Sequence, residues 1–412
     1  MKYIAVFVLL LSALLGGEWS APIDIFTATV VIGPVVGVDG TGNAVIIATT
    51  TPDGTTYYTN YAQLVGGSVT NSGNFGSFSI SSVSNVISVN SAGNAASSWR
   101  ERMGSGILFK GAVLLNGTWT LPAALSDPIN FQSPFYSPGI NLDSSNTALV
   151  VWTAEEIASP HDYAVQFNTY FGGWLVSPGT AFLPSPATDV LGNLVFAGSP
   201  TGQGLALWLD GTNPKVQSSY YDGSGWHANS LLSTNVNTTY AANAVAMNAS
   251  NNGILLWGNP TLGINSSYFS NPFSYLTEQT VYLGGSNNTV PNAVVCLSES
   301  GVATALWVVH NTVTMDYSLF SSSSQSGGAW GPTTTLATPS TNFVQSPNIA
   351  VDGSGNVYAV WEQDDAFGNG FVYYNQYQVS TSNWLAQPIL LSSLGHFQHN
   401  QICRSMRLEM QL

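Results

Sequence analysis

Basic residues are scarce in this chain of 412 residues. Lysine and arginine together number 7, against 21 aspartate and glutamate residues, which gives a formal net charge of −14. A nucleic-acid-binding surface needs a stripe of basic side chains that displaces counterions, and so few cations cannot form one. The same shortage excludes an arginine cluster that clamps a substrate carboxylate, and the sequence has no glycine-rich phosphate loop with its lysine.

Cysteine is also scarce, and the histidines of the repeated units are not clustered. The two cysteines, Cys296 and Cys403, give no disulfide framework, and Cys296 falls in an apolar stretch where a small thiol packs as a hydrophobic side chain. His161, His227 and His310 stand apart, with no second histidine or cysteine at the spacing of a metal motif. The sequence therefore predicts neither a metal site nor a cofactor.

Long hydrophobic runs are absent after the N-terminus. The run from Ile4 to Leu15 follows one basic residue, Lys2, and is too short to span a bilayer as a helix. With the small residues Gly16 and Gly17 behind it, it fits a secretory signal peptide over residues 1–17, with an uncleaved anchor as the competing interpretation. We expect no membrane span after its removal, and a secreted, periplasmic or cell-surface protein.

The rest of the chain repeats one unit, and Ser346 to Ser393 is its clearest copy. Its four predicted strands are Asn348 to Val351, Asn356 to Trp361, Phe371 to Gln378 and Pro388 to Leu391. Gly, Asp, Asn and Ser fill the gaps between them, as in an antiparallel sheet with short turns. One such sheet cannot bury both faces alone, so copies are expected to stack face against face.

Two aromatic markers give the number of units. The second strands carry Trp99, Trp152, Trp208, Trp257, Trp307 and Trp361, with Ala48 at that place in the earliest unit. The residues just before the fourth strands are Trp119, Trp174, Trp226, Trp330 and Trp384, with Phe273 and Phe75 as substitutes. Both markers predict seven units, and hence an all-β, seven-bladed β-propeller of four-stranded antiparallel blades.

The turn between first and second strands is a third marker. It is Asp39-Gly-Thr-Gly-Asn43 in the first unit and Asp352-Gly-Ser-Gly-Asn356 in the last. The aspartate can accept hydrogen bonds from the backbone that follows it, and Gly or Asn tolerates the positive φ of a tight reversal. We favour this turn chemistry over calcium binding, because each turn supplies one carboxylate where calcium needs several oxygen ligands.

These residues carry a resemblance to known repeats. The pattern P-x-I-A-V-D-x-x-G-N-x-Y-A-V-W around Pro347 to Trp361 resembles the repeat of NHL-type β-propellers, and the aromatic residue before the fourth strand resembles the blades of exported sialidase-like propellers. The resemblance covers about residues 19 to 393 and concerns architecture. The Asp-box of true sialidases is not matched, so the resemblance implies no catalytic residue.

The predicted domain organisation is simple. Residues 1–17 are the signal peptide, 18–393 the propeller and 394–412 an atypical tail, which is either disordered or the product of a frameshift or truncation. In the second case, an eight-bladed ring is the alternative. Either the segment from Trp19 to Ile25 or the segment from Gln387 to Leu391 supplies the strand that closes the ring.

Charged residues follow the second-strand tryptophans and predict where a ligand binds. Connections from second to third strand and from fourth to next first strand share one face of a propeller, and loops on a rigid scaffold often carry binding residues. The candidates are Glu101, Glu155, Glu156, Asp162, Asp210, His310, Glu362, Asp364 and Asp365, with Phe135 and Tyr136 from a fourth-to-first connection. A solvated rim of charges, which keeps the protein soluble, is the competing interpretation.

The function predicted from this rim is binding. Aromatic rings beside polar groups suit sugars, so we expect a non-catalytic binding or interaction propeller whose partner is a glycan or a protein. The alternative is a glycoside hydrolase or lyase that pairs Glu155 or Glu156 with Glu362 or Asp364 as general acid and base.

Overall fold

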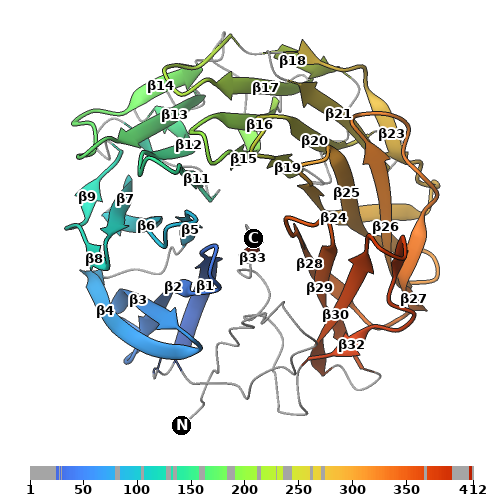
Figure 1. Ribbon diagram of the computed structural model, residues 1–412, viewed down its shortest axis with the longest axis horizontal. Helices are drawn as coiled ribbons and strands as arrows, with labels where there is room; N and C mark the ends of the chain where they lie inside the picture. The colour runs from blue at the N-terminus through green and yellow to red at the C-terminus, as the bar shows by residue number, and fades with distance from the viewer. Residues whose placement is uncertain are drawn as a thin grey trace. The chain divides into compact units, whose positions relative to one another are not determined.

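The protein has the seven-bladed β-propeller fold. The computed structural model describes residues 25–26, 28, 30–78, 84–103, 106–126, 131–132, 137–156, 163–182, 191–210, 215–228, 230–234, 244–259, 263–270, 274–365, 369–391 and 408–410. In these ranges the regular structure is all β, and no helix is long and apolar enough to cross a membrane. The strands form seven antiparallel sheets, called blades 1 to 7 below, in which strands that follow one another in sequence lie side by side (Figure 1).

The chain divides into two compact units, each described here by itself. Unit 1 comprises Met1–Ala187 and Arg404–Leu412, and unit 2 comprises Thr188–Cys403. Unit 1 contains blades 1 to 3. Their strands are β1 (Val30–Val38), β2 (Ala44–Thr51), β3 (Tyr57–Val65) and β4 (Ser68–Phe78); β5 (Val86–Val89), β6 (Ala95–Met103), β7 (Gly106–Leu115), β8 (Thr118–Trp119) and β9 (Ala123–Ala124); and β10 (Phe131–Gln132), β11 (Gly139–Leu142), β12 (Ala148–Glu156), β13 (Tyr163–Tyr170) and β14 (Gly179–Phe182).

Unit 2 contains blades 4 to 7. Their strands are β15 (Leu191–Gly198), β16 (Gly204–Asp210), β17 (Lys215–Tyr221) and β18 (Ser230–Ser233); β19 (Ala244–Met247), β20 (Gly253–Gly258), β21 (Ile264–Ser270), β22 (Ser274–Tyr275) and β23 (Gln279–Tyr282); β24 (Asn288–Leu297), β25 (Val302–Asn311), β26 (Tyr317–Gln325) and β27 (Thr334–Ser340); and β28 (Val344–Val351), β29 (Val357–Asp364), β30 (Gly370–Gln378), β31 (Asn383–Trp384) and β32 (Ile389–Leu390). The C-terminal candidate, Gln387 to Leu391, contains β32, which pairs with β30 as β31 does and so completes the sheet of blade 7. The N-terminal candidate lies almost wholly outside the described residues.

The tryptophans of the second strands occupy one register position. Leu297 pairs with Ala303 in blade 6, and Val351 pairs with Val357 in blade 7; in both, the tryptophan lies four residues further on. The indoles of Trp99, Trp152, Trp208, Trp257, Trp307 and Trp361 are buried almost completely. Burial of the second-strand tryptophans confirms them as the structural centres of six blades.

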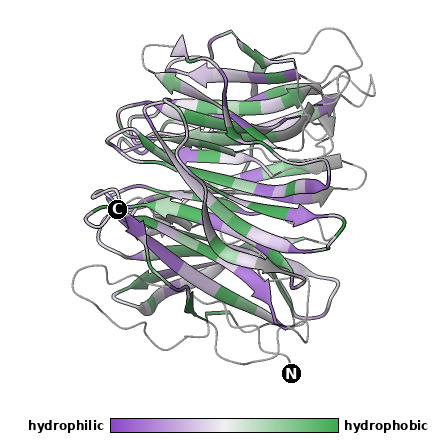
Figure 2. Cartoon of the chain, turned by 90° about the vertical axis from the view of Figure 1, so that its right-hand side faces the viewer, coloured by the Kyte–Doolittle hydropathy of each residue, from purple (hydrophilic) through white to green (hydrophobic). Residues whose placement is uncertain are grey.

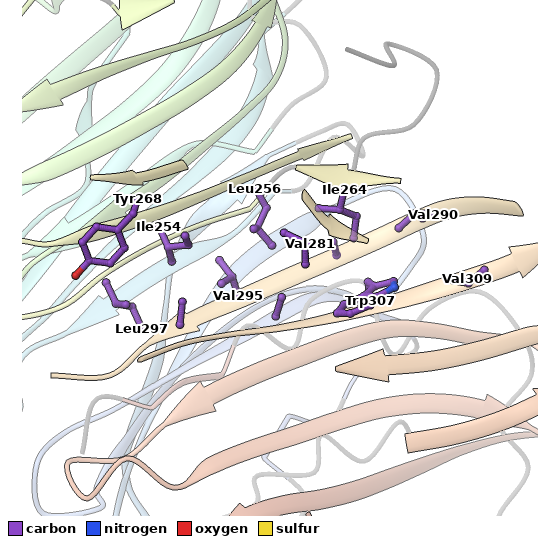
Figure 3. Packing of buried hydrophobic residues seen from close by; sticks show 13 residues of the cluster. Ile254, Leu256, Ile264, Tyr268, Val281, Val290, Val295, Leu297, Trp307 and Val309 are labelled. Carbon is purple, nitrogen blue, oxygen red and sulfur yellow. The ribbon is translucent and has the colours of Figure 1, made fainter. Parts of the chain in front are cut away.

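Each described inter-blade core joins one sheet to the next within a unit. Trp307 of blade 6 packs with Ile254, Leu256 and Ile264 of blade 5, and Figure 3 shows these side chains in one layer between the sheets. Trp361 packs in the same way with residues of blade 6, and Trp152 with residues of blade 2. Figure 2 shows the hydrophobic residues distributed along the strands of the sheets. Because each fully buried aromatic side chain of this size contributes several kcal/mol, roughly 3 to 5, these layers hold the blades together.

The seven first-to-second turns share one hydrogen-bonding scheme. The head residue is Asp39, Asn90, Asp143, Ser199, Asn248, Ser298 or Asp352, and its side-chain oxygen accepts the N–H four residues on at 2.7 to 3.3 Å. The third residue after the head is always Gly or Asn, with φ between 62° and 87°. This confirms the predicted turn chemistry, because the carboxylate oxygens are used by the turn's own donors.

Two aromatic substitutes differ from the sequence prediction. In blade 5 the residue that pairs at the tryptophan position is Tyr275, opposite Phe269, whereas Phe273 lies outside the described residues. Phe75 lies inside the long strand β4 rather than before it, and its ring stacks on Trp99 at a centroid distance of 4.8 Å. The fourth strand of blade 1 is continuous, whereas in blades 2, 5 and 7 two short strands take the place of the fourth strand.

The first strands are longer than predicted because they contain bulges. The register shifts between Ile32 and Val35 in β1, and equivalent shifts interrupt β15, β24 and β28. Pro34, Pro291 and Pro347 lie in three of these bulges, where a residue without an N–H costs no ladder hydrogen bond. Within the tail, β33 (Leu408–Met410) pairs in parallel with β1, and the two interpretations of residues 394–412 stay predictions.

Candidate functional site

Three aromatic rings gather at one end of blades 6 and 7, on the face that the sequence predicts for binding. His310 is near the end of β25, Tyr317 begins β26, and Phe343 immediately precedes β28. The His310 and Tyr317 rings stack with centroids 4.3 Å apart and planes 11° apart. The Tyr317 and Phe343 rings stack at 4.6 Å and 29°. These three residues form what we call the aromatic step.

Within the aromatic step, the Tyr317 ring is buried and the Phe343 ring is partly exposed to solvent. Tyr317 is 9% exposed and belongs to the core between blades 6 and 7, with Leu336, Ala337 and Val344. Its burial raises the pKa of the Tyr317 hydroxyl, which therefore stays neutral at ordinary pH. Phe343 is 50% exposed. The stack thus presents one phenyl ring to solvent on a rigid base.

The connection from β25 to β26 is held in shape beside the step. The Asn311 side-chain oxygen accepts the N–H groups of Val313 and Thr314 at 2.9 and 3.0 Å, and the Asn311 N–H donates to the Asp316 carbonyl at 2.9 Å. Met315 has φ +59°, a conformation that few non-glycine residues adopt, and it is 54% exposed. This short loop is therefore preorganised, with apolar side chains at its tip.

Two carboxylates come together on blade 7. Glu362 and Asp364 are two residues apart in β29, so they share the face opposite to the one that carries Trp361. Gly370 pairs with Asp364, and a Cβ placed on Gly370 would lie 2.6 Å from Glu362 Oε1 and 3.5 Å from Asp364 Oδ1. Asp364 is buried, with 6% of its surface exposed. The missing side chain of Gly370 leaves room for the two carboxylates to converge.

Asp365 and Glu101, both predicted as site residues, have structural roles. Asp365 accepts the Asn369 N–H and side-chain amide, both at 2.9 Å, and so closes the turn into β30. Glu101 accepts the Trp99 indole N–H at 2.8 Å and pairs with Lys110 at 2.9 Å. Its oxygens are used inside blade 2. Glu101 therefore lies in strand β6 and not in a loop, whereas Asp365 lies in a loop after β29 as predicted, and a binding role for either residue stays a prediction.

The other predicted residues are placed only in part. Glu155 and Glu156 lie in β12, where their backbones pair with Gln132 and Phe131 of β10, and Asp210 ends β16. These positions lie in strands, not in loops as predicted, because the second strands extend beyond the tryptophan. The side chains of Glu156 and Asp210, and all of Phe135, Tyr136 and Asp162, lie outside the described residues. Glu155 and Glu156 belong to unit 1, so their pairing with Glu362 or Asp364 of unit 2 stays a prediction.

The aromatic step includes two residues that the sequence did not indicate. Tyr317 and Phe343 meet His310 only through the packing of blade 7 on blade 6. A signal for Phe343 did exist, since it lies just ahead of β28, a strand whose bulge is marked by Ser346-Pro347. Among the described residues, no group of three His, Cys, Asp or Glu side chains is arranged to hold a metal ion.

Comparison with known proteins gives the fold. No protein-family model matches the chain, and no curated protein matches its sequence. The solved structures that are similar include polysaccharide lyase Uly1 (TM-score 0.50, 10% identity, 89% of this chain and 94% of that chain). They also include the β-propeller domain of the Trilobed protease from Pyrococcus furiosus (0.48, 6%, 89% and 98%). A third is the Hadza microbial sialidase Hz136 (0.41, 8%, 68% of this chain), of whose length this chain spans 63%.

Proposed function

We propose that this protein is an exported, non-catalytic binding propeller, and that the aromatic step of blades 6 and 7 binds a sugar ring of a glycan. The observation that carries the proposal is the half-exposed Phe343 ring on a stacked base. The C–H face of a pyranose packs on such a ring, while nearby polar groups bind its hydroxyls. Asn311, Asn342 and Asp316 flank the step in the sequence and are polar.

The stacked base favours a ligand over a simple solvated rim. An exposed phenyl ring gains nothing from water, and ordering it on Tyr317 restricts its motion before any ligand arrives. Preorganisation of this kind lowers the entropy cost of binding. The fold also occurs in Uly1, a polysaccharide lyase, which is consistent with a glycan ligand. A protein ligand is the other outcome that the experiment below can give.

Glycan binding by Phe343→Ala and by a matched control tests the proposal. Phe171 is also exposed, at 86%, but lies after β13 in blade 3, far along the chain from the step. We expect wild type and Phe171→Ala to bind the same glycans on an array, and Phe343→Ala to bind them about fivefold more weakly, from roughly 1 kcal/mol of ring stacking. Equal binding by the two variants, or no glycan retained by wild type, would contradict the proposal.

A second candidate function follows from the carboxylate pair. Glu362 and Asp364 converge over Gly370, and two neighbouring carboxyl groups are what a glycoside hydrolase uses as acid and base or nucleophile. Hydrolysis of chromogenic glycosides by wild type, lost in Glu362→Gln and Asp364→Asn but kept in Asp365→Asn, would favour catalysis. Asp365 is the matched control because its carboxylate serves the turn.

A further inference from the structure

A buried arginine between blades 2 and 3 of unit 1 is unsatisfied. Arg100 follows Trp99 in β6, and because side chains alternate along a strand, it points to the opposite side from Trp99. Trp99 stacks on Phe75 of blade 1, whereas Ala96, on the side of Arg100, packs in the core shared with blade 3. Arg100 is only 7% exposed, and its buried Nε and Nη1 atoms have no hydrogen-bond partner among the residues that the structure describes.

The nearest carboxylate in sequence cannot neutralise this guanidinium. Glu101 is committed to Lys110 at 2.9 Å and to the Trp99 indole at 2.8 Å. Burial lowers the pKa of Arg100, but a guanidinium keeps its proton in proteins. A buried, unpaired charge is strongly unfavourable. Among the described residues, no carboxylate therefore pairs with this cation, in a chain with three times as many acidic as basic residues.

The blade fold does not require arginine at this place. The residues directly after the second-strand tryptophan position are Thr49, Arg100, Thr153, Leu209, Gly258, Val308 and Glu362, one from each blade. In blade 1, Thr49 is hydrogen-bonded to Asn85, which precedes the first strand of the next blade. The pairing register puts Pro138 at the place of Asn85 in blade 3. A proline has no side-chain acceptor, so Arg100 lacks the partner that its blade 1 counterpart has.

An unsatisfied acceptor faces the same layer. Gln166 of β13 pairs with Trp152 and so shares the side of Trp152 that packs on Phe109 of blade 2. Its Oε1 atom is buried and has no hydrogen-bond partner in the described part of the chain, and the residue is 2% exposed. A ligand that satisfies both groups needs an anion for the guanidinium and an O–H donor for the amide oxygen.

We propose that Arg100 binds the carboxylate of a uronic acid, at a site between blades 2 and 3 to which Gln166 contributes an acceptor for a sugar hydroxyl. A uronic acid carries both groups on one ring, and arginine binds a carboxylate through two parallel hydrogen bonds. The site is separate from the aromatic step, which lies in unit 2. It therefore extends the proposed function to acidic glycans and is testable without it.

Calorimetric titration with galacturonate, glucuronate, their neutral parent sugars and acetate tests this site. Wild type is expected to bind at least one uronate at least tenfold more tightly than its parent sugar and than acetate. Arg100→Met, which keeps the apolar stem, loses that preference by at least tenfold. Lys215→Met, which removes the same charge in unit 2, is expected to keep the wild-type preference for uronate.

Stability without ligand gives a second readout. Because the buried charge is unpaired, Arg100→Met is expected to unfold at a urea concentration no lower than that of Lys215→Met, and uronate no longer raises its midpoint. Unchanged uronate binding by Arg100→Met, the absence of uronate binding by wild type, or acetate binding as tight as uronate binding overturns the proposal. So does a lower midpoint for Arg100→Met, which would mean that the guanidinium has a structural partner.

Discussion

Three second-strand tryptophans differ in what their indole N–H contacts, and this difference predicts a graded effect of Trp→Phe substitution. Trp99 donates to the Glu101 carboxylate at 2.8 Å, and Trp361 donates to the Gln363 amide oxygen at 3.4 Å. The Trp257 indole nitrogen is buried and has no hydrogen-bond partner among the described residues. All three side chains are at most 1% exposed, and each lies at the same register position. The substitution therefore removes a similar volume from similar surroundings.

The expected difference in stability between the three variants follows from the indole hydrogen bond alone. Loss of the pyrrole ring leaves a comparable cavity at each site, so the cavity cost cancels in a comparison. A hydrogen bond to a charged acceptor is worth about 1.5 to 3 kcal/mol, whereas a buried donor without a partner costs about 1 to 3 kcal/mol. Trp99→Phe loses the hydrogen bond to the Glu101 carboxylate, whereas Trp257→Phe removes the cost of a buried donor that has no partner among the described residues. We expect Trp99→Phe to be more destabilised than Trp257→Phe by about 2 kcal/mol or more, with Trp361→Phe between them.

Urea unfolding followed by tryptophan fluorescence and by circular dichroism measures the order. Trp361 and Trp257 belong to unit 2 and Trp99 to unit 1, so the midpoint of each unit's transition is compared with wild type if two transitions appear. Trp361 against Trp257 is the comparison within one unit. Equal destabilisation by all three substitutions, or Trp257→Phe as the most destabilised, would show that the indole contacts do not set the cost.

Two further predictions concern titratable groups. Burial by itself would raise the pKa of Asp39, but hydrogen bonds from Thr41 and Asn43 outweigh it and leave that pKa below its ordinary value. The stability that Asp39 contributes is therefore present above the pKa of the unfolded state, and it is lost as the pH falls through the pKa of the folded state. Asp39→Ala should therefore lower the free energy of unfolding by about 1 kcal/mol at pH 7 and by less at pH 3. Asp39→Asn, which places the residue found at Asn90 in this turn, should lower it less than Asp39→Ala at pH 7. A difference in stability between wild type and Asp39→Ala that is the same at both pH values contradicts this. Burial also raises the pKa of the Cys296 thiol to about 12. In a Cys403→Ser variant, iodoacetamide at pH 8.5 should therefore alkylate Cys296 of the native protein roughly a thousandfold or more slowly than that of the urea-unfolded protein. Rapid labelling of the native protein would contradict that burial.

The parts of the fold that follow from short-range chemistry could be predicted from the sequence. The turn from Asp352 to Asn356 contains its own hydrogen-bond acceptor and a glycine where φ is +87°, so one repeat is enough to identify it. The tryptophan position is equally clear, because one bulky side chain recurs at the centre of a short apolar strand. These two features fix the number of blades and the strand order within a blade.

Several predicted strand ends were wrong, and the bulges explain why. The first strand of blade 7 begins at Val344, not at Asn348, because Ser346, with φ +51°, and Pro347 form a bulge that interrupts the alternating pattern. The second strand continues past Trp361 to Asp364 for the same reason: its partner, beyond the bulge, extends to Val344. Residues expected in loops, such as Glu362, therefore lie in strands.

The candidate sites depend on how one blade meets the next, which a single repeat does not encode. Phe343 becomes part of the aromatic step only when blade 7 packs on blade 6, and Arg100 meets Pro138 of blade 3 at the place where Thr49 meets Asn85 of blade 2. The position after the tryptophan varies in every physical property across the blades, from Gly258 to Glu362. A position that the fold does not constrain tolerates residues that are unfavourable for stability, and a buried cation remains unfavourable until an anion binds it. Divergence between repeats at that position thus indicates binding residues, whereas the shared tryptophans and turns indicate architecture.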